Sequence, residues 1–185
     1  APTATFGVFD YADFVEKFLD FLDVKEVFIL GHSMGGAVAI AYCSKYSRAK
    51  KLILEDSAGI RRNKSLTTRI KIYLYRTLKL LVLPLYREQL KNFFGSPDYK
   101  NAGPMRKILI KVVNEDLRFA LGSVKKPTLI LWGKEDKTTP LKEGEILKVG
   151  IPDSRLYVFE KCDHFPHLEY PEKFAQIVTD FLINN

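Results

Sequence analysis

Four short apolar runs, separated by longer segments with helical periodicity, constrain the fold of this chain most strongly. We expect the runs to be strands, and they cover residues 27–30, 51–56, 128–133 and 155–159. We expect helices between and after them, over residues 11–23, 34–46, 141–149 and 171–182. Strands that alternate with helices predict an α/β fold with a parallel sheet, and continuous apolar runs fit strands that are buried on both faces.

Two of the expected helices carry a clear apolar stripe. The stripe of residues 11–23 consists of Phe14, Phe18, Phe21 and Leu22. The stripe of residues 171–182 consists of Phe174, Ile177, Val178 and Phe181. Such spacing indicates amphipathic helices that pack on the sheet or on one another. Pro171 suits the first turn of the second of these helices.

Residues 61–120 interrupt the alternation and differ in charge from the rest of the chain. The 185-residue chain has a formal net charge of +7, whereas residues 61–111 hold 13 Lys and Arg against two acidic residues, a net +11. Helical patterns cover residues 70–82, 85–94 and 105–121. We therefore expect a core formed by residues 1–60 and 121–185, with a helical cap or lid inserted at 61–120.

The charge and the cysteine content limit the kinds of partner and site. A basic insertion is most simply a solvated basic face, and weak contact with an anionic membrane surface is the alternative. No nucleic-acid-binding motif accompanies the charge, so we expect no nucleic-acid partner. Two cysteines exclude a disulfide scaffold and a four-thiolate zinc site. Because no apolar run approaches about 18 residues and no leader pattern is visible, we expect a cytoplasmic protein.

One motif carries chemistry: residues 31–35, Gly-His-Ser-Met-Gly, match the pattern G-x-S-x-G. An expected strand comes just before it and a helix rich in small residues just after it, which is the context of a nucleophile elbow. On such a turn Ser33 would be exposed as a nucleophile, and the N–H groups at the start of the helix would face a developing oxyanion. The alternative is a glycine-rich turn with an idle serine.

A nucleophilic serine needs a base, and the chain has three histidines. His32 lies inside the turn next to Ser33 and cannot readily fold back onto its neighbour. His164 follows the last expected strand, so it lies at the same edge of the sheet as Ser33. His167 lies three residues further on. We favour His164 as the base and expect a structural role for His167.

The base needs an acid to orient it, and two aspartates are candidates. Asp136 follows the third expected strand and gives the order Ser, Asp, His that this arrangement requires. Asp56 follows the second strand and is the competitor. Asp163 is adjacent to His164 and is poorly placed to reach its ring. Asp163 with the two nearby histidines would also form a possible metal-ligand set, which we do not favour.

Three segments together resemble the α/β-hydrolase superfamily. They are Gly-His-Ser-Met-Gly-Gly at 31–36, Pro-Thr-Leu-Ile-Leu-Trp-Gly-Lys-Glu-Asp at 127–136 and Cys-Asp-His-Phe-Pro-His-Leu-Glu-Tyr-Pro at 162–171. The resemblance implies a nucleophile, acid, base and oxyanion donor at the matching positions, which are Ser33, Asp136, His164 and the N–H of Met34. It also implies that the insertion covers the site and selects a small acyl substrate, here an apolar one, without a cofactor or a metal.

The chain departs from this family in two places. Asp163 stands where the family usually has a glycine before the base. The family also usually has about four strands before the elbow and a loop that supplies the second oxyanion donor, whereas 26 residues precede the first strand here. We therefore expect a partial sheet without its N-terminal half, in which residues 27–30 form an edge strand. Aggregation or dimerisation through that edge is expected.

Three functions follow from these observations. We expect first a serine hydrolase that acts on carboxylic esters or related acyl compounds through Ser33, Asp136 and His164. The second possibility is hydrolysis of an activated carbon–carbon bond, as in the family's dienoate hydrolases. The third is a non-catalytic fragment or binding module, because the oxyanion hole would lack one donor.

Overall fold

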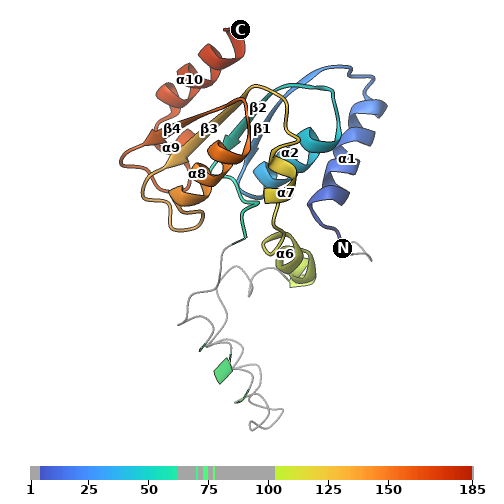
Figure 1. Ribbon diagram of the computed structural model, residues 1–185, viewed down its shortest axis with the longest axis vertical. Coiled ribbons are helices and arrows are strands. Elements are labelled where there is room, and N and C mark those ends of the chain that lie inside the picture. Colours follow the sequence, from blue (N-terminus) through green and yellow to red (C-terminus); the bar gives the residue numbers. More distant parts are fainter. Residues whose placement is uncertain (1–4, 62–69, 71–72, 75–76, 78–102, 185) are drawn as a thin grey trace. The chain divides into compact units, whose positions relative to one another are not determined.

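The computed structural model of this protein describes residues 5–61, 70, 73, 74, 77 and 103–184. Among these residues the strands form one four-stranded parallel sheet in the order β1-β2-β3-β4 (Figure 1). The strands are β1 (Val27–His32), β2 (Ala49–Glu55), β3 (Thr128–Gly133) and β4 (Ser154–Phe159). The expected parallel α/β architecture is confirmed, and every strand ends within two residues of its expected bounds.

The main helices also form where the periodicity predicts them. They are α1 (Val8–Phe21), α2 (Met34–Lys45), α8 (Leu141–Gly150) and α10 (Pro171–Ile183). A further single-turn helix, α9 (Pro166–Glu169), was not expected from the sequence. It begins at one proline and ends just before Pro171, which starts α10.

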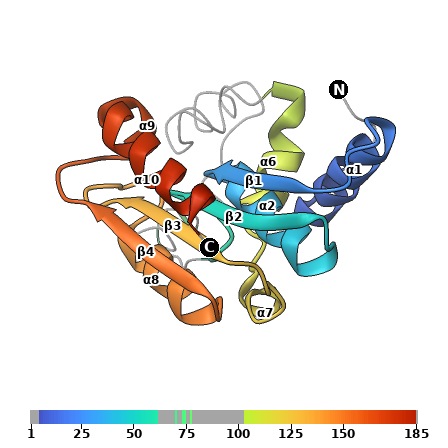
Figure 2. The same cartoon turned by 90° about the horizontal axis from the view of Figure 1, so that it is seen from above.

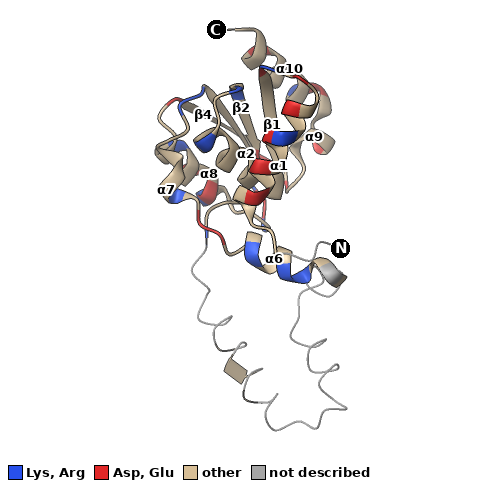
Figure 3. Cartoon of the chain, turned by 90° about the vertical axis from the view of Figure 1, so that its right-hand side faces the viewer, with Lys and Arg blue, Asp and Glu red and all other residues tan. Residues whose placement is uncertain are grey.

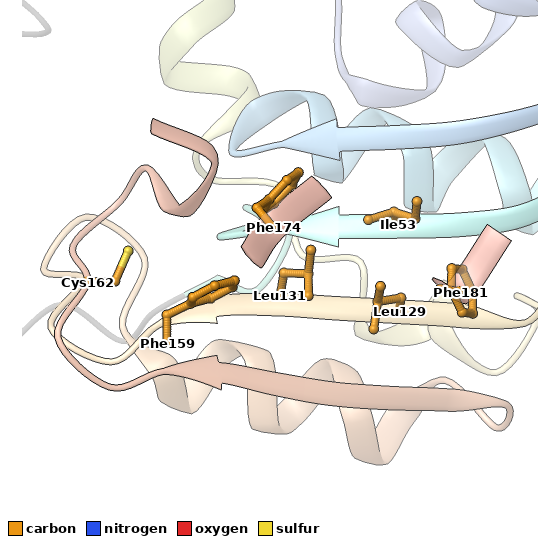
Figure 4. Packing of buried hydrophobic residues seen from close by; sticks show 7 residues of the cluster. All are labelled: Ile53, Leu129, Leu131, Phe159, Cys162, Phe174 and Phe181. Carbon is orange, nitrogen blue, oxygen red and sulfur yellow. The ribbon is translucent and has the colours of Figure 1, made fainter. Parts of the chain in front are cut away.

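One face of the sheet is covered by α10 (Figure 2). The apolar stripe of this helix packs there as expected, since Phe174 and Phe181 are buried against β2 and β3. Figure 4 shows this cluster, whose buried members are Ile53, Leu129, Leu131, Phe159, Cys162, Phe174 and Phe181. Burying a large apolar side chain contributes about 1.5–3 kcal/mol, so the cluster anchors the C-terminal helix firmly.

The opposite face is covered by α2 on β1 and β2 and by α8 on β3 and β4. Trp132 of β3 is fully buried on this side, and its indole Nε1–H donates to the carbonyl oxygen of Thr139 at 2.8 Å. This bond fixes the loop that follows β3. Since parallel strands all end at one edge of the sheet, the loops after β1, β2, β3 and β4 are brought together there.

The expected packing of α1 was wrong. The helix buries Val8, Ala12 and Leu19, whereas the four stripe residues Phe14, Phe18, Phe21 and Leu22 are exposed. The buried side of α1 faces α2, and polar contacts complete it: the Tyr42 hydroxyl donates to Glu16 at 2.6 Å. The phenylalanine stripe therefore lies on the outside of the helix pair.

The strand β1 is at the end of the strand order and pairs on one side with β2, within the part of the chain that the structure describes. Its residues Phe28 and Leu30 are exposed. An apolar edge strand is thus present where the sequence predicts one. Whether a second copy pairs with it stays a prediction.

The chain divides into two compact units, one of residues 6–61 and 111–185 and the other of residues 1–5 and 62–110. The expected helix over 85–94 lies outside the described residues, and most of the helix over 70–82 does too. The described parts of the latter, Ile70, Tyr73, Leu74 and Thr77, are helical. The cap function of residues 61–120 stays a prediction.

The expected single helix over residues 105–121 is interrupted. The structure has a 3-10 turn η2 (Gly103–Met105), then α6 (Arg106–Val112) and α7 (Arg118–Leu121). The break is stabilised by two bonds: the Leu117 N–H donates to the Gly59 carbonyl at 2.8 Å, and the Arg118 N–H donates to the Asp116 side chain at 3.3 Å. A side-chain acceptor just before a helix favours a new helix start there.

Basic residues recur on α6 (Figure 3), where Arg106, Lys107 and Lys111 lie. A search of the described residues for helices long and apolar enough to cross a membrane found none.

Candidate active site

Ser33 lies on the turn between β1 and α2, in a backbone conformation that non-glycine residues rarely adopt. Its φ is 51° and its ψ is −118°. Four backbone bonds hold it there. The Ser33 N–H donates to the Glu55 carbonyl at 3.0 Å, and the Ser33 carbonyl accepts from the N–H groups of Gly36 at 3.0 Å, Ala37 at 3.4 Å and Ala58 at 2.9 Å. Backbone strain of this kind persists where the surroundings over-determine it, and it is common at active sites.

The turn is tight because β1 and α2 approach each other closely at Gly31. A Cβ on Gly31 would lie 2.5 Å from the Gly35 carbonyl oxygen and 2.7 Å from the Gly36 Cα. Ordinary contacts of this kind are 3.4–4 Å. The first glycine of the G-x-S-x-G motif is thus required by packing, and its smallness lets the helix begin directly behind Ser33.

The structure brings His164 and Asp136 together. The His164 Nδ1–H donates to Asp136 Oδ2 at 2.7 Å, and both side chains are buried. Asp136 also accepts from the Thr138 N–H at 2.6 Å, the Thr139 N–H at 3.0 Å and the Thr139 hydroxyl at 2.6 Å. Burial alone raises the pKa of Asp136, but the bonds from Thr139 and His164 outweigh it and hold that pKa below its usual range. Asp136 is therefore ionised, and it fixes the tautomer of His164 with its Nε2 unprotonated.

The competing aspartate, Asp56, lies beside Asp136 and His164, but the described residues contain no hydrogen bond between Asp56 and His164. Asp56 is fully buried, and its Oδ1 accepts from the Gly133 N–H at 2.9 Å. Its Oδ2 is buried and has no hydrogen-bond partner among the residues that the structure describes. Burial raises the pKa of Asp56 to about 8, with a smaller contribution from the neighbouring Asp136, against the lowering effect of the Gly133 N–H. Of the two candidates, Asp136 has the geometry of an orienting acid.

The other two histidines attach the loop after β4 to its neighbours. The His32 Nε2–H donates to the His164 carbonyl at 2.8 Å, and the two rings lie 4.7 Å apart. His167 donates from its backbone N–H at 3.0 Å and from Nδ1 at 2.7 Å to the same oxygen of Glu55. Glu55 ends β2 and is buried. These bonds hold the loop that carries His164 against β1 and β2.

Ser33 and His164 lie in loops at the same edge of the sheet, but the described residues contain no hydrogen bond between them. The link is indirect, since His32 precedes Ser33 and contacts the His164 ring. Bonds between a nucleophile and its base are often long without substrate. Met34 begins α2, so its N–H belongs to the first helical turn, whose N–H groups have no intrahelical acceptor.

The possible metal-ligand set of Asp163, His164 and His167 is not assembled. His164 and His167 are bonded to different carboxylates, and the Asp163 N–H donates to Glu169. Another set does lie close together: ligand atoms of Asp56, Asp136 and His164 lie within 4.8 Å of one another. The direct 2.7 Å bond between Asp136 and His164 is that of a shared proton, because two ligands of one zinc ion at about 2 Å each would lie further apart.

Sequence reasoning missed two residues of this site, Glu55 and Thr139. Thr139 lies three residues after Asp136 and donates back to its side chain, a local arrangement that an Asp followed by Thr can signal. Glu55 is a charged residue at the end of an otherwise apolar run. Its position at a strand end was visible in the sequence, but its partner His167 lies 112 residues away.

Comparisons with known proteins show which family of proteins this chain is similar to. The family model described as "Alpha/beta hydrolase family" matches residues 1–177. A 2-hydroxy-6-oxo-6-phenylhexa-2,4-dienoate hydrolase from Comamonas testosteroni is 28% identical over 190 residues, covering 91% of this chain and 66% of the relative. A 2-hydroxy-6-oxononadienedioate/2-hydroxy-6-oxononatrienedioate hydrolase from Pseudomonas putida is 30% identical over 188 residues, covering 89% and 65%. The chain thus spans slightly less than two thirds of the length of these relatives.

Solved structures resemble the fold over nearly the whole chain. An esterase from Exiguobacterium antarcticum matches with a TM-score of 0.72 and 26% identity, covering 98% of this chain and 75% of that protein. A meta-cleavage product hydrolase from Pseudomonas fluorescens matches with a TM-score of 0.70, covering 98% and 74%. Its identity of 21% supports the likeness of fold alone.

Proposed function

This chain belongs to the alpha/beta hydrolase family, and we propose that it is a hydrolase in which Ser33 is the nucleophile, His164 the base and Asp136 the orienting acid. The observation that carries the proposal is the buried bond from His164 Nδ1–H to Asp136 at the sheet edge where the strained Ser33 directly precedes α2. The oriented imidazole can take the proton of a serine hydroxyl, and the Met34 N–H can stabilise the resulting oxyanion.

We further propose that the bond cleaved is a carbon–carbon bond next to a ketone, in a 2-hydroxy-6-oxo-dienoate. The support is the group of relatives that share 26–30% identity with the chain, which are hydrolases of such compounds. Each compound carries a ketone at carbon 6. In its 2-oxo tautomer carbon 5 is saturated and lies between that ketone and an enone, so the enone can receive the electron pair of the broken bond as a dienolate. The same triad can serve this chemistry and ester hydrolysis, because both begin with attack on a carbonyl carbon.

The proposed reaction runs in two stages after a tautomerisation, in which the 2-hydroxyl gives up a proton and carbon 5 takes one up. Ser33 Oγ then adds to the carbon-6 ketone as His164 takes its proton, and the bond between carbons 5 and 6 breaks with its electron pair forming a dienolate over carbons 2 to 5. His164 returns its proton to the dienolate oxygen, and the shorter 2-hydroxydienoate leaves. Water, activated by His164, adds to the acyl group on Ser33 and releases it as a carboxylic acid. Asp136 stays ionised throughout and stabilises the imidazolium.

A kinetic experiment tests this function. The purified chain is mixed with 2-hydroxy-6-oxo-6-phenylhexa-2,4-dienoate, and the loss of its conjugated absorbance is followed. We expect turnover, and a loss of several orders of magnitude in Ser33→Ala. Ser44→Ala is the matched control, because this serine lies on the same helix and its hydroxyl bonds within the helix to Ala41. Absence of turnover by the unchanged chain, or full turnover by Ser33→Ala, would overturn the proposal.

Ester hydrolysis is the second candidate, favoured by the 26% identity to the Exiguobacterium antarcticum esterase. Release of p-nitrophenolate from p-nitrophenyl acetate measures it on the same samples. If kcat/KM for the ester exceeds that for the dienoate, the ester is the better account of the site. A serine-directed fluorophosphonate probe should label the unchanged chain and Ser44→Ala but not Ser33→Ala with either substrate class.

A further inference from the structure

A second buried carboxyl, that of Asp56, lies beside the proposed acid Asp136. This residue follows β2 directly, and its φ of 39° is unusual for a non-glycine residue. Bonds on both sides hold its backbone: its N–H donates to the Leu131 carbonyl at 3.0 Å, and its carbonyl accepts from the Thr139 hydroxyl at 3.0 Å. The side chain is completely buried, with one oxygen on the Gly133 N–H and the other without a partner in the part of the chain that the structure describes.

A buried carboxylate oxygen without a hydrogen-bond donor is energetically unfavourable. The acidic groups around Asp56 raise the free-energy cost of ionising it further. The titratable groups around it are Asp136, Glu55, His164 and Cys162. Asp136 is ionised, because it accepts bonds from two backbone N–H groups, a hydroxyl and His164. Two carboxyls so close in a buried site cannot both ionise without a large penalty. One of them therefore carries a proton, and Asp136 is the one already stabilised as an anion.

The hydrogen bonds of Thr139 also favour a proton on Asp56. Its hydroxyl has one proton and two acceptors within reach, Asp136 Oδ2 at 2.6 Å and the Asp56 carbonyl at 3.0 Å. It can serve only one of them at a time. A proton on Asp56 would supply the donor that this group of acceptors otherwise lacks, and it would give the unpartnered oxygen a bond.

We propose that Asp56 holds a proton at neutral pH and donates it to Asp136, which makes Asp56 a positioning residue that fixes the Asp136 carboxylate against His164. The catalytic consequence rests on the proposed function, whereas the protonation of Asp56 does not. Since burial raises the pKa of Asp56 to about 8, the proton is lost near that pH. Above it, two adjacent anions repel each other and Asp136 is driven from His164.

The variant Asp56→Asn separates the two protonation states. Its amide oxygen can still accept from the Gly133 N–H, and its NH₂ group can donate to Asp136 at any pH. We expect kcat/KM of the unchanged chain to fall as the pH rises through about 8, and we expect this alkaline limb to be absent in Asp56→Asn. An alkaline limb that persists at the same pH in Asp56→Asn would overturn the proposal.

Asp56→Ala tests the positioning role, since alanine supplies neither a donor to Asp136 nor an acceptor to Gly133. We expect kcat to fall about 10- to 100-fold with a much smaller change in KM, and we expect Asp56→Asn to restore most of that loss. Equal losses in kcat for the two variants would contradict a role in donating to Asp136. Glu160→Gln is the control, because it removes an exposed carboxyl that follows β4 and is paired with Lys134.

A substrate-free measurement keeps this proposal separate from the proposed function. The free energy of unfolding is measured in urea from pH 5 to pH 9. Between about pH 4 and pH 8 the folded state would hold a proton on Asp56 that the unfolded state has lost, so stability should fall as the pH rises. We expect that fall to be smaller in Asp56→Asn than in Glu160→Gln. Parallel curves would refute the buried proton even if the enzyme is active, and a clear difference would support it even if the enzyme is not.

Discussion

The two outer glycines of the G-x-S-x-G motif should respond in opposite ways to alanine. A Cβ on Gly31 would lie 2.5 Å from the Gly35 carbonyl oxygen, against 3.4 Å or more in an ordinary contact, so the start of α2 would have to retreat by about 0.9 Å. The obstacle is backbone, which cannot rotate away. Forcing a methyl group into such a contact typically costs about 1–3 kcal/mol. For a chain of this size that corresponds to a fall in Tm of roughly 2–4 °C per kcal/mol.

The displacement also acts on the chemistry, because Ser33 lies between the two segments that would separate. A shift of about 1 Å in a reacting group can cost about 100-fold in rate. Gly35→Ala is the matched variant: apart from its chain neighbours and the adjoining backbone of α2, no heavy atom of the described residues lies within 4 Å of the position of its Cβ. Gly35 lies within α2, where alanine is favoured over glycine by about 0.5–1 kcal/mol. We therefore expect Gly35→Ala to be as stable as the unchanged chain or slightly more stable.

Urea unfolding and fluorophosphonate labelling of the two variants measure these effects. The expected result is a lower unfolding free energy and slow labelling for Gly31→Ala, with neither change for Gly35→Ala. A stable, rapidly labelled Gly31→Ala would show that the close approach of β1 and α2 is not what the turn requires. Equal damage in both variants would show that other chain segments pack against Gly35.

Three further predictions concern the site and the sheet edge. Asp136→Asn should lower kcat by about 10⁴-fold at pH 7, since the amide favours the wrong tautomer of His164, whereas Asp56→Asn should lower it far less. Glu55→Ala should lower the free energy of unfolding in urea by about 2 kcal/mol, because two N–H donors of His167 lose their acceptor, and Glu55→Gln should cost less. Light scattering should show concentration-dependent self-association of the 185-residue chain through β1, and Phe28→Lys should reduce it, because a charge on an edge strand opposes pairing; a monomer at all concentrations would contradict this.

The strands and main helices could be predicted from the sequence because each is specified by a local pattern. The apolar run at 128–133 coincides with β3, and the stripe that includes Phe174 and Phe181 packs as its spacing indicates. The stripe of α1 misled because periodicity shows which side of a helix is apolar but not what covers it. The helix packs on α2 through Val8, Ala12 and Leu19, and its phenylalanines stay outside. The break before α7 was missed because it depends partly on a bond from Leu117 to the distant Gly59.

The position of the site could be predicted from the order of the strands more than from the G-x-S-x-G motif. The sequence placed Asp56, Asp136, His164 and His167 after strand ends, and a parallel sheet then brought them to one edge. It favoured Asp136 as the partner of His164 but did not find the second imidazole–carboxylate bond at this edge, His167 with Glu55, which has the same length of 2.7 Å.

What separates these two pairs is their surroundings. Asp136 has donors on both oxygens, and the ring of His164 is buried, with its Nε2 left for a proton from Ser33. Glu55 instead binds the backbone and the ring of His167 with one oxygen, and the His167 side chain is partly exposed. Glu55 accepts from both the backbone and the ring of His167, so it fixes a loop. Asp136 is itself held by several donors, so it fixes the proton on the ring nitrogen that faces it. The Glu55–His167 pair holds the loop that carries His164, and the Asp136–His164 pair sets the tautomer of the His164 ring. Both pairs therefore determine how this one imidazole is positioned and protonated.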